Sequence, residues 1–156
     1  MRVHICAVGR LRVGPERVLL DDYLARFDRG GRSIGLGPAT LHEVEDKTGS
    51  GPDAEAALLA RVVPKNAVIC ILDERGKTLS SPDFAASLAR WRDDGWRDLA
   101  FVIGGADGIA KAMRQTADFT LSFGAMVWPH RLVRVMLSEQ LYRAVSILAG
   151  APYHRA

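Results

Sequence analysis

The segment Ala67-Val68-Ile69-Cys70-Ile71-Leu72 is an unbroken apolar run, and it is the clearest indication of the fold in this chain. Six apolar residues without alternation are typical of a strand that is covered on both faces, as in a parallel sheet. We therefore predict a buried strand here and place it at the centre of the sheet. Val3–Val8 and Leu99–Ile103 are apolar runs of the same kind and predict two further strands.

Strands and helices alternate on both sides of this run. Two more strands are predicted at Ile34–Val44, which glycine and proline interrupt, and at Phe119–Phe123. Between the strands, apolar residues recur at helical spacing, and some of these segments begin with a proline that suits a first helical turn. The predicted helices are the segment after Gly14-Pro15, Asp53–Val63, Ser81 to near Gly95, Ile109–Ala117 and about Leu132 to Leu148.

This alternation predicts an α/β fold with a mostly parallel sheet and helices on both of its faces. A chain of 156 residues fits one domain, so we expect a single domain over residues 1–156. The last predicted helix has apolar residues on more than one face, and we expect it to bury against the sheet and against a partner subunit.

The composition, 48% hydrophobic and 25% charged residues, is ordinary for a globular domain. The sequence has neither an apolar run near the ~20 residues of a membrane helix nor the features of a signal peptide. We therefore expect a cytoplasmic protein with no membrane partner. Cys6 and Cys70 lie within apolar runs and are expected to be buried thiols. Because no Cys or His cluster has metal-ligand spacing, no metal is expected.

Positive charge is concentrated at both ends of the chain. The net charge is only +3, but seven arginines lie within residues 1–32, and after Phe119 four arginines accompany one acidic residue, Glu139. This distribution is compatible with an RNA or phosphate partner, although charge alone does not distinguish it from a solvated surface.

Three loops at the carboxyl ends of predicted strands are candidates for a ligand site, because parallel sheets bind ligands there. They are Leu72–Lys77, Gly104–Gly108 and Gly124–Pro129. The pair Gly104-Gly105 lets the backbone approach a ligand closely, although turn formation alone also explains it. The loops match neither the dinucleotide fingerprint nor the phosphate-binding loop, which argues against nicotinamide and ATP.

The last seven residues, Gly150–Ala156, contain Tyr153, His154 and Arg155 in a row. A tyrosine can stack on a base, a histidine can exchange a proton near neutral pH, and an arginine can bind phosphate or a base edge. Together these side chains suit a nucleotide, although a polar terminus of no function remains open on composition alone.

Five segments of the sequence have to be considered together. They are Leu72-Asp73-Glu74-Arg75-Gly76-Lys77, Ile103-Gly104-Gly105-Ala106-Asp107-Gly108, Pro129-His130-Arg131-Leu132-Val133-Arg134-Val135, Glu139-Gln140-Leu141-Tyr142-Arg143-Ala144 and Pro152-Tyr153-His154-Arg155. In order and spacing they resemble the bacterial large-subunit ribosomal RNA pseudouridine N3-methyltransferase family, a SPOUT-class family. The resemblance covers essentially the whole chain. Its departures are Trp128, where leucine is common, and Ala106-Asp107, where Pro-Glu is frequent.

The resemblance implies a C-terminal deep trefoil knot, a homodimer, and S-adenosylmethionine as methyl donor. It also implies that the substrate is N3 of a pseudouridine in a hairpin of large-subunit ribosomal RNA, within the assembled ribosome. By resemblance, the cofactor pocket would be lined by Leu72, Ile103, Gly104, Gly105, Gly124, Ala125, Met126, Val127, Trp128 and Pro129. Four residues would act at the RNA side as the catalytic group: Arg143, Tyr153, His154 and Arg155.

Methyl transfer to N3 requires that this nitrogen lose its proton. His154 is the leading candidate for the acceptor, with a backbone carbonyl or water as the alternatives. Arg143 lies four residues after Glu139, so a helix-surface ion pair is the alternative to a role at the RNA. We expect His130 to be a structural residue at the helix start.

Two other functions remain open from the sequence. A SPOUT methyltransferase that acts on transfer RNA or on a ribose hydroxyl would share the fold and the donor. A noncatalytic RNA-binding or nucleotide-binding α/β module is the alternative from a different class. Product mapping separates the first alternative, and binding of the methyl donor separates the second.

Overall fold

Five parallel strands form one sheet in the order β2-β1-β4-β3-β5. The computed structural model describes residues 1–154. Its strands are β1 (Arg2–Val8), β2 (Ala39–Val44), β3 (Val68–Thr78), β4 (Asp98–Ile103) and β5 (Phe119–Ser122). Each of the five predicted strands is therefore present, and the sheet is parallel throughout.

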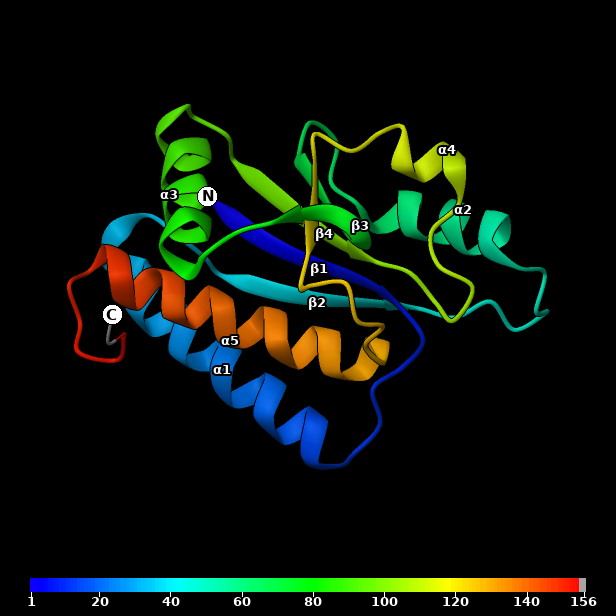
Figure 1. Cartoon of the computed structure of the whole chain (residues 1–156), viewed down its shortest axis with the longest axis horizontal. Coiled ribbons are helices and arrows are strands. Elements are labelled where there is room, and N and C mark those ends of the chain that lie inside the picture. The colour runs from blue at the N-terminus through cyan, green and yellow to red at the C-terminus, as the bar shows by residue number, and fades with distance from the viewer. Residues whose placement is uncertain (155–156) are drawn as a thin grey trace.

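Helices cover both faces of the sheet (Figure 1). On one face lie α1 (Pro15–Gly31), α3 (Ser81–Asp93) and α5 (His130–Leu148), and on the other lie α2 (Pro52–Val62) and α4 (Lys111–Arg114). Two separate apolar clusters fill the two layers. Ile5 and Phe101 pack toward α1, α3 and α5, whereas Cys6 and Val102 pack toward α2 and α4. The predicted α/β class with helices on both faces is confirmed.

The centre of the sheet is β4, so the prediction that Ala67–Leu72 forms the central strand is wrong. All six residues of β4 are buried, and β4 pairs with β1 and β3. β3 lies one strand further out, between β4 and β5. The apolar runs Ala67–Leu72 and Leu99–Ile103 are both covered by helices on two faces. Hydrophobicity indicates this burial, but it does not indicate the order of the strands in the sheet.

β3 also extends further than predicted. The segment Leu72–Lys77 was expected to be a loop, but β3 continues to Thr78 and pairs with β5 on both sides of a register shift between Leu72 and Lys77. The backbone returns to the sheet at Gly76, where a Cβ would lie 2.7 Å from the Thr120 carbonyl oxygen. Asp73–Arg75 therefore form a bulge at the strand end, and the absence of a side chain at Gly76 permits it.

Three other boundaries differ from the prediction. The second strand starts only at Ala39, because Arg32–Ile34 form a short 3-10 helix. α4 is confined to Lys111–Arg114, since Ala110 has extended backbone angles and is buried. α5 begins at His130, two residues before the predicted start.

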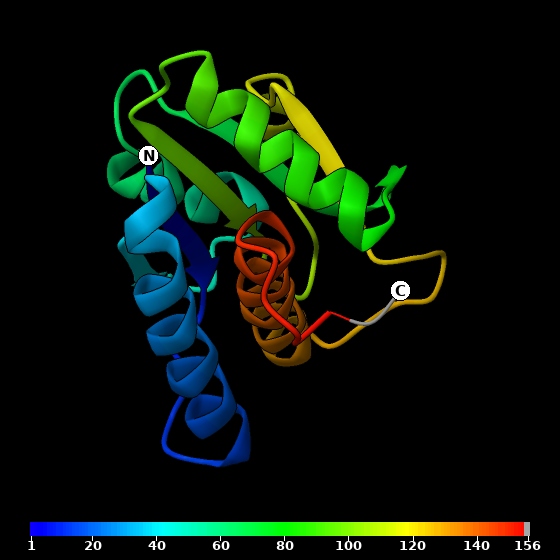
Figure 2. The same ribbon diagram turned by 90° about the vertical axis from the view of Figure 1, so that its left-hand side faces the viewer.

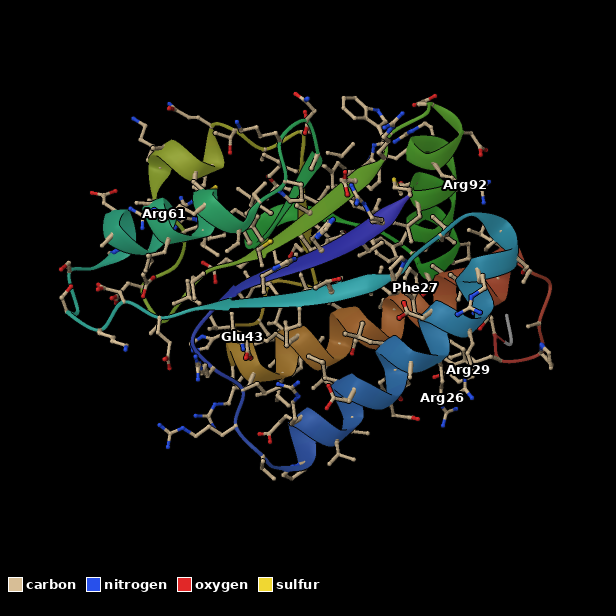
Figure 3. The ribbon with its side chains drawn as sticks, turned by 180° about the vertical axis from the view of Figure 1, so that it is seen from behind. Arg26, Phe27, Arg29, Glu43, Arg61 and Arg92 are labelled. Carbon is tan, nitrogen blue, oxygen red and sulfur yellow. The ribbon has the colours of Figure 1, made fainter. Side chains whose placement is uncertain are left out.

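The start of α5 is tied to the sheet by a buried ion pair. Nη1 of Arg134 lies 3.0 Å from Oε1 of Glu43, and the Arg134 guanidinium also donates to the carbonyl oxygen of Val8. Arg134 is only 1% exposed. Figure 3 shows Glu43 on β2 beside the first turns of α5. Because a buried charge is costly without its partner, this pair fixes the beginning of α5 against the carboxyl ends of β1 and β2.

A second polar cluster lies at the opposite, amino end of the strands. Arg2 donates twice to the Asp98 carboxylate, at 2.7 and 2.8 Å, and Nε2 of His4 lies 2.8 Å from the same carboxylate. The other ring nitrogen of His4 lies 3.0 Å from His42. The Arg2 hydrogen bonds hold the pKa of Asp98 below its usual value, and burial followed by repulsion from His4 lowers the pKa of His42.

Cys6 and Cys70 are buried and unpaired, as expected. No helix within residues 1–154 is long and apolar enough to cross a bilayer. The trefoil knot stays a prediction.

Candidate functional site

Three chain segments enclose a cavity of about 610 Å³ at the carboxyl edge of the sheet, and we call it the strand-end cavity. The segments are the bulge of β3 with Leu72 before it, the glycine loop after β4, and the loop between β5 and α5. The first turn of α5 closes one side with His130 and Val133. These are the three loops that the parallel-sheet rule selected from the sequence, so topology brings them to one edge.

Backbone shape makes the wall of this cavity. A Cβ at Gly104 would lie 2.7 Å from the Gly108 carbonyl oxygen and 2.6 Å from a side-chain carbon of Ile109. A Cβ at Gly105 would lie 2.8 Å from both carboxylate oxygens of Glu55 on α2. The Gly108 backbone leaves no room for a Cβ at Gly104, so the loop requires glycine there, whereas at Gly105 only the Glu55 side chain would have to move.

Ser122 joins two of the three segments. Its hydroxyl is 3.1 Å from the carbonyl oxygen of Glu74 in the bulge, and it accepts a hydrogen bond of 3.1 Å from the Gly124 N–H. Gly124 has φ of +113°, a backbone conformation that suits glycine. The side chain of Ser122 is buried, so this junction links the bulge to the β5–α5 loop out of solvent.

Most of the residues predicted for a cofactor pocket come together here. Leu72, Ile103, Gly104, Gly105, Gly124, Met126, Val127, Trp128 and Pro129 all line the strand-end cavity, and Ala125 does not. Met126 and Val127 are 71% and 82% exposed. The β5–α5 loop thus presents apolar side chains to solvent beside the cavity.

Sequence reasoning missed several lining residues. Arg114 reaches the strand-end cavity from α4, and Nε of Arg114 lies 3.3 Å from Oδ2 of Asp73. His130, expected only as a structural residue, lines the cavity as well. The predicted boundary of α4 included Arg114, but no pattern in the sequence indicated that its side chain would turn toward the strand ends.

The C-terminal residues assemble separately, around Glu139 on α5. Oε1 of Glu139 lies 2.6 Å from Nη2 of Arg143 and accepts a hydrogen bond of 3.0 Å from the Tyr153 hydroxyl. The Tyr153 ring packs on Tyr142, with centroids 4.4 Å apart, and under the Arg143 guanidinium, 4.9 Å from the ring centre. We call Glu139, Tyr142, Arg143, Tyr153 and His154 the tail cluster. Figure 2 shows the segment after α5 turning back beside that helix.

The environment of the tail cluster raises the pKa of two of its members, Tyr153 and Arg143. Burial, followed by the hydrogen bond to Glu139, raises the pKa of Tyr153 above its ordinary value. The hydrogen bond to Glu139 also raises the pKa of Arg143. The buried Nδ1 of His154 has no hydrogen-bond partner within residues 1–154. Arg155, the remaining predicted member, lies outside the described residues.

The tail cluster and the strand-end cavity are apart in one chain. Neither Arg143, Tyr153 nor His154 lines the cavity. Val133 and Arg143 both belong to α5, ten residues apart, which corresponds to about 15 Å along the helix axis. The ion pair between Glu139 and Arg143, the alternative left open by the sequence, is present.

A second hollow of about 510 Å³, the interhelix groove, lies between α1, the start of α3 and α5. It shares Leu121, Phe123 and Gly124 with the strand-end cavity and reaches Glu139 at its other end. The groove therefore runs from the cavity toward the tail cluster on the molecular surface.

A family model described as "Predicted SPOUT methyltransferase" matches residues 1–154 of the chain. The chain belongs to the SPOUT methyltransferase family. A protein of Ruegeria pomeroyi named "Ribosomal RNA large subunit methyltransferase H" is 69% identical to it over 155 residues, and these cover 99% of each chain. A protein of the same name from Ruegeria sp. (strain TM1040) is 67% identical over 155 residues, with the same coverage.

A solved structure has a similar fold. It is described as a probable methylase family protein from Haemophilus influenzae Rd KW20, and it superposes with a TM-score of 0.52 over 99% of this chain and 70% of that one. The sequence identity is 10%, so the likeness concerns the fold alone. Within residues 1–154, no group of three or more His, Cys, Asp or Glu side chains could hold a metal ion.

Proposed function

We propose that this protein transfers a methyl group from S-adenosylmethionine to N3 of a pseudouridine in large-subunit ribosomal RNA, within the assembled ribosome. The observation that carries the proposal is the full-length identity of 63% or more to relatives named as large-subunit ribosomal RNA methyltransferases. The pseudouridine and the donor come from the resemblance of the five sequence segments described above.

The strand-end cavity suits this donor. Its volume of about 610 Å³ lies in the range of small-molecule sites. Apolar side chains such as Leu72, Ile103 and Val133 can cover an adenine ring, and the tight glycine loop brings backbone groups within reach of its edge. Polar residues also line the cavity beside these apolar side chains. This combination suits S-adenosylmethionine, which has an aromatic end and a charged end.

When bound, S-adenosylmethionine supplies a methyl group on a sulfonium, and the leaving group is a neutral thioether. The chain's own contribution is to hold the target nitrogen in line with that methyl group and to exclude water from the cavity. Trp128, Met126 and Val127 line the cavity, and in this proposal they would cover it and the base that enters it.

The proton on N3 needs an acceptor, and His154 fills that role in this proposal. Its Nδ1 has no hydrogen-bond partner within residues 1–154, so no contact with a described residue occupies that nitrogen. Arg143, Tyr153 and Arg155 would contact the RNA, with the arginines binding phosphates. Glu139 would keep Tyr153 and Arg143 in position, because it accepts hydrogen bonds from both.

A homodimer would bring the two halves of the site together. Val133 of the strand-end cavity and Arg143 of the tail cluster lie about 15 Å apart along α5 in one chain, further than the contact distance that methyl transfer requires. The interhelix groove and the exposed Val127, Met126 and Leu132 offer an apolar surface beside both. We propose that α5 pairs with its copy there, so that the tail of one subunit serves the strand-end cavity of the other.

Recognition of the RNA would depend on the shape of the ribosome. A chain of 156 residues leaves little surface for reading a long sequence. Intact ribosomes should therefore be much better substrates than free ribosomal RNA, and equal initial rates on the two would remove this part of the proposal.

The decisive test is transfer of radiolabelled methyl groups from S-adenosylmethionine to ribosomes from a strain that lacks the corresponding gene. We expect N3-methylpseudouridine by mass spectrometry of the labelled RNA. Labelling of transfer RNA or of ribose hydroxyls instead would assign a different substrate to the same fold. Failure to bind the donor at all would contradict the proposal.

A further inference from the structure

The strand-end cavity contains one ion pair that joins two of its walls. Arg114 comes from α4 and Asp73 from the bulge of β3, and Nε of Arg114 lies 3.3 Å from Oδ2 of Asp73. Both side chains line the cavity. The Arg114 side chain is 38% exposed and that of Asp73 is 12% exposed. The pair therefore lies where the cavity meets solvent.

Each partner is held in position by a further contact. Oδ1 of Asp73 accepts a hydrogen bond of 2.9 Å from the backbone N–H of Arg75, which turns the carboxylate toward Arg114. Nη2 of Arg114 lies over the glycine loop, 3.8 Å from where a Cβ of Gly108 would be. Within residues 1–154, Asp73 is the single acid that forms an ion pair with Arg114. The guanidinium thus spans from the bulge to the glycine loop.

The chemistry of this pair matches one end of the proposed donor. S-adenosylmethionine carries an α-carboxylate and an α-ammonium on its methionine part, at the end remote from adenine. A guanidinium binds a carboxylate through two parallel hydrogen bonds, and a carboxylate binds an ammonium. A zwitterion is also the part of the donor that least tolerates an apolar interior, so its favourable place is the polar rim of the cavity.

We propose that Arg114 and Asp73 form the subsite for the amino-acid end of the methyl donor. The Arg114 fork binds the α-carboxylate and Asp73 binds the α-ammonium. The two residues exchange part of their mutual contact for contacts with the zwitterion. This inference rests on the proposed function, because it takes S-adenosylmethionine as the donor.

The other charged residues of the cavity fit this role less well. Glu74, Arg75 and Asp107 form no ion pair within residues 1–154, and Arg75 approaches Asp73 through its backbone N–H. Arg114 and Asp73 are the oppositely charged side chains of this cavity that form an ion pair with each other. A ligand that carries a carboxylate and an ammonium on one carbon can therefore contact Arg114 and Asp73 at the same time.

The test compares two nucleosides by calorimetric titration. S-adenosylhomocysteine carries the amino-acid end, and 5′-methylthioadenosine lacks it. For Arg114→Met we expect the affinity for S-adenosylhomocysteine to fall about tenfold or more, because a charge-assisted hydrogen bond is lost. The affinity for methylthioadenosine should stay within about twofold. Asp73→Asn should likewise lower the affinity for S-adenosylhomocysteine and leave the affinity for methylthioadenosine nearly unchanged.

Arg61→Met is the matched control, since it removes the same charge from an exposed position on α2 that does not line the cavity (Figure 3). It should leave both affinities unchanged. Arg114→Lys keeps the positive charge but lacks the guanidinium group that donates two parallel hydrogen bonds. It should lose less affinity for S-adenosylhomocysteine than Arg114→Met.

Equal losses for the two nucleosides in Arg114→Met, or no loss for either, would overturn the subsite and leave the proposed function intact. If the wild-type protein bound neither nucleoside, the proposed function would fail and the subsite with it. Thermal unfolding of each variant shows whether the fold is preserved.

Discussion

The strand-end cavity and the tail cluster are built in opposite ways. The cavity owes its shape to backbone, with Gly104 and Gly105 packed so closely that a Cβ would overlap neighbouring atoms. The tail cluster owes its shape to polar side chains gathered around one carboxylate, Glu139. The cavity should therefore fail when a side chain is added at Gly104, whereas the tail cluster should fail when particular functional groups are removed. Substitutions can test this difference directly.

The largest effect is expected at His154. His154→Gln removes the proposed proton acceptor, and we expect the single-turnover rate on ribosomes to fall by about 10² to 10⁴, the usual contribution of a general base. Donor affinity should be unchanged, because His154 is proposed to act on the RNA base and does not line the strand-end cavity of its own chain. A wild-type rate with saturating ribosomes would exclude His154 as the acceptor.

Gly104→Val tests whether the strand-end cavity fails when a side chain is added to its wall. The added side chain meets the Gly108 backbone and Ile109, and backbone cannot move aside as a flexible side chain can. We expect affinity for S-adenosylhomocysteine to fall by about 100-fold or more. Gly14→Ala is the control, because its nearest neighbour is 3.5 Å away and nothing there obstructs a methyl group. Tight binding by Gly104→Val would contradict the proposed fit.

Mixed dimers can show whether the two regions cooperate between subunits. A Gly104→Val subunit keeps its tail, and a His154→Gln subunit keeps its cavity. Co-expression should restore about a quarter of the wild-type activity, because half of randomly assorted dimers are mixed and each of these holds one complete site. If each chain used its own tail, mixing would restore nothing.

Glu139→Gln should have a moderate effect. It weakens the hydrogen bonds to Tyr153 and Arg143, and we expect kcat to fall about tenfold with donor affinity unchanged. A tyrosinate titration provides an independent measurement. Burial and then Glu139 raise the pKa of Tyr153 above 10, so part of the upward shift should be lost in the variant. An unaltered titration curve would show that Tyr153 does not depend on Glu139.

The smallest effect concerns the amino end of the sheet, far from both regions. Because the folded-state pKa of His42 lies below 6.5, the unfolded chain binds the proton more readily, and stability decreases as the pH falls below about 6.5. His42→Gln should reduce this decrease in urea unfolding between pH 7.5 and 5.5. Identical pH dependence in the two proteins would show that His42 does not contribute.

The sequence predicted the parts of this molecule that depend on local pattern. Apolar runs located the five strands, and the rule that ligands bind at strand ends selected the loops around the cavity. The order of the strands could not be predicted this way, because the apolar runs Ala67–Leu72 and Leu99–Ile103 do not indicate which strands lie beside them.

The residues missed in the site share one property, which is that tertiary packing decides their direction. Arg114 on α4 reaches Asp73 at the end of β3, and this contact joins two elements that are far apart in the sequence. Glu139 was noted as an isolated acid near the chain's end, and its role at the centre of the tail cluster depends on the final segment turning back along α5. The spacing of residues in the sequence does not predict that this segment turns back along the helix.

The two buried cysteines give the chain a practical advantage. Cys6 is 0% exposed and Cys70 1% exposed, and burial raises the pKa of Cys6 to about 12 and that of Cys70 further. Thiol reagents attack the thiolate, so both side chains should be almost inert to labelling in the folded protein. A single cysteine introduced beside the C-terminal segment could carry a spin label without prior removal of the native thiols. Distances between paired labels would then follow the tail in the working enzyme while ribosomes bind.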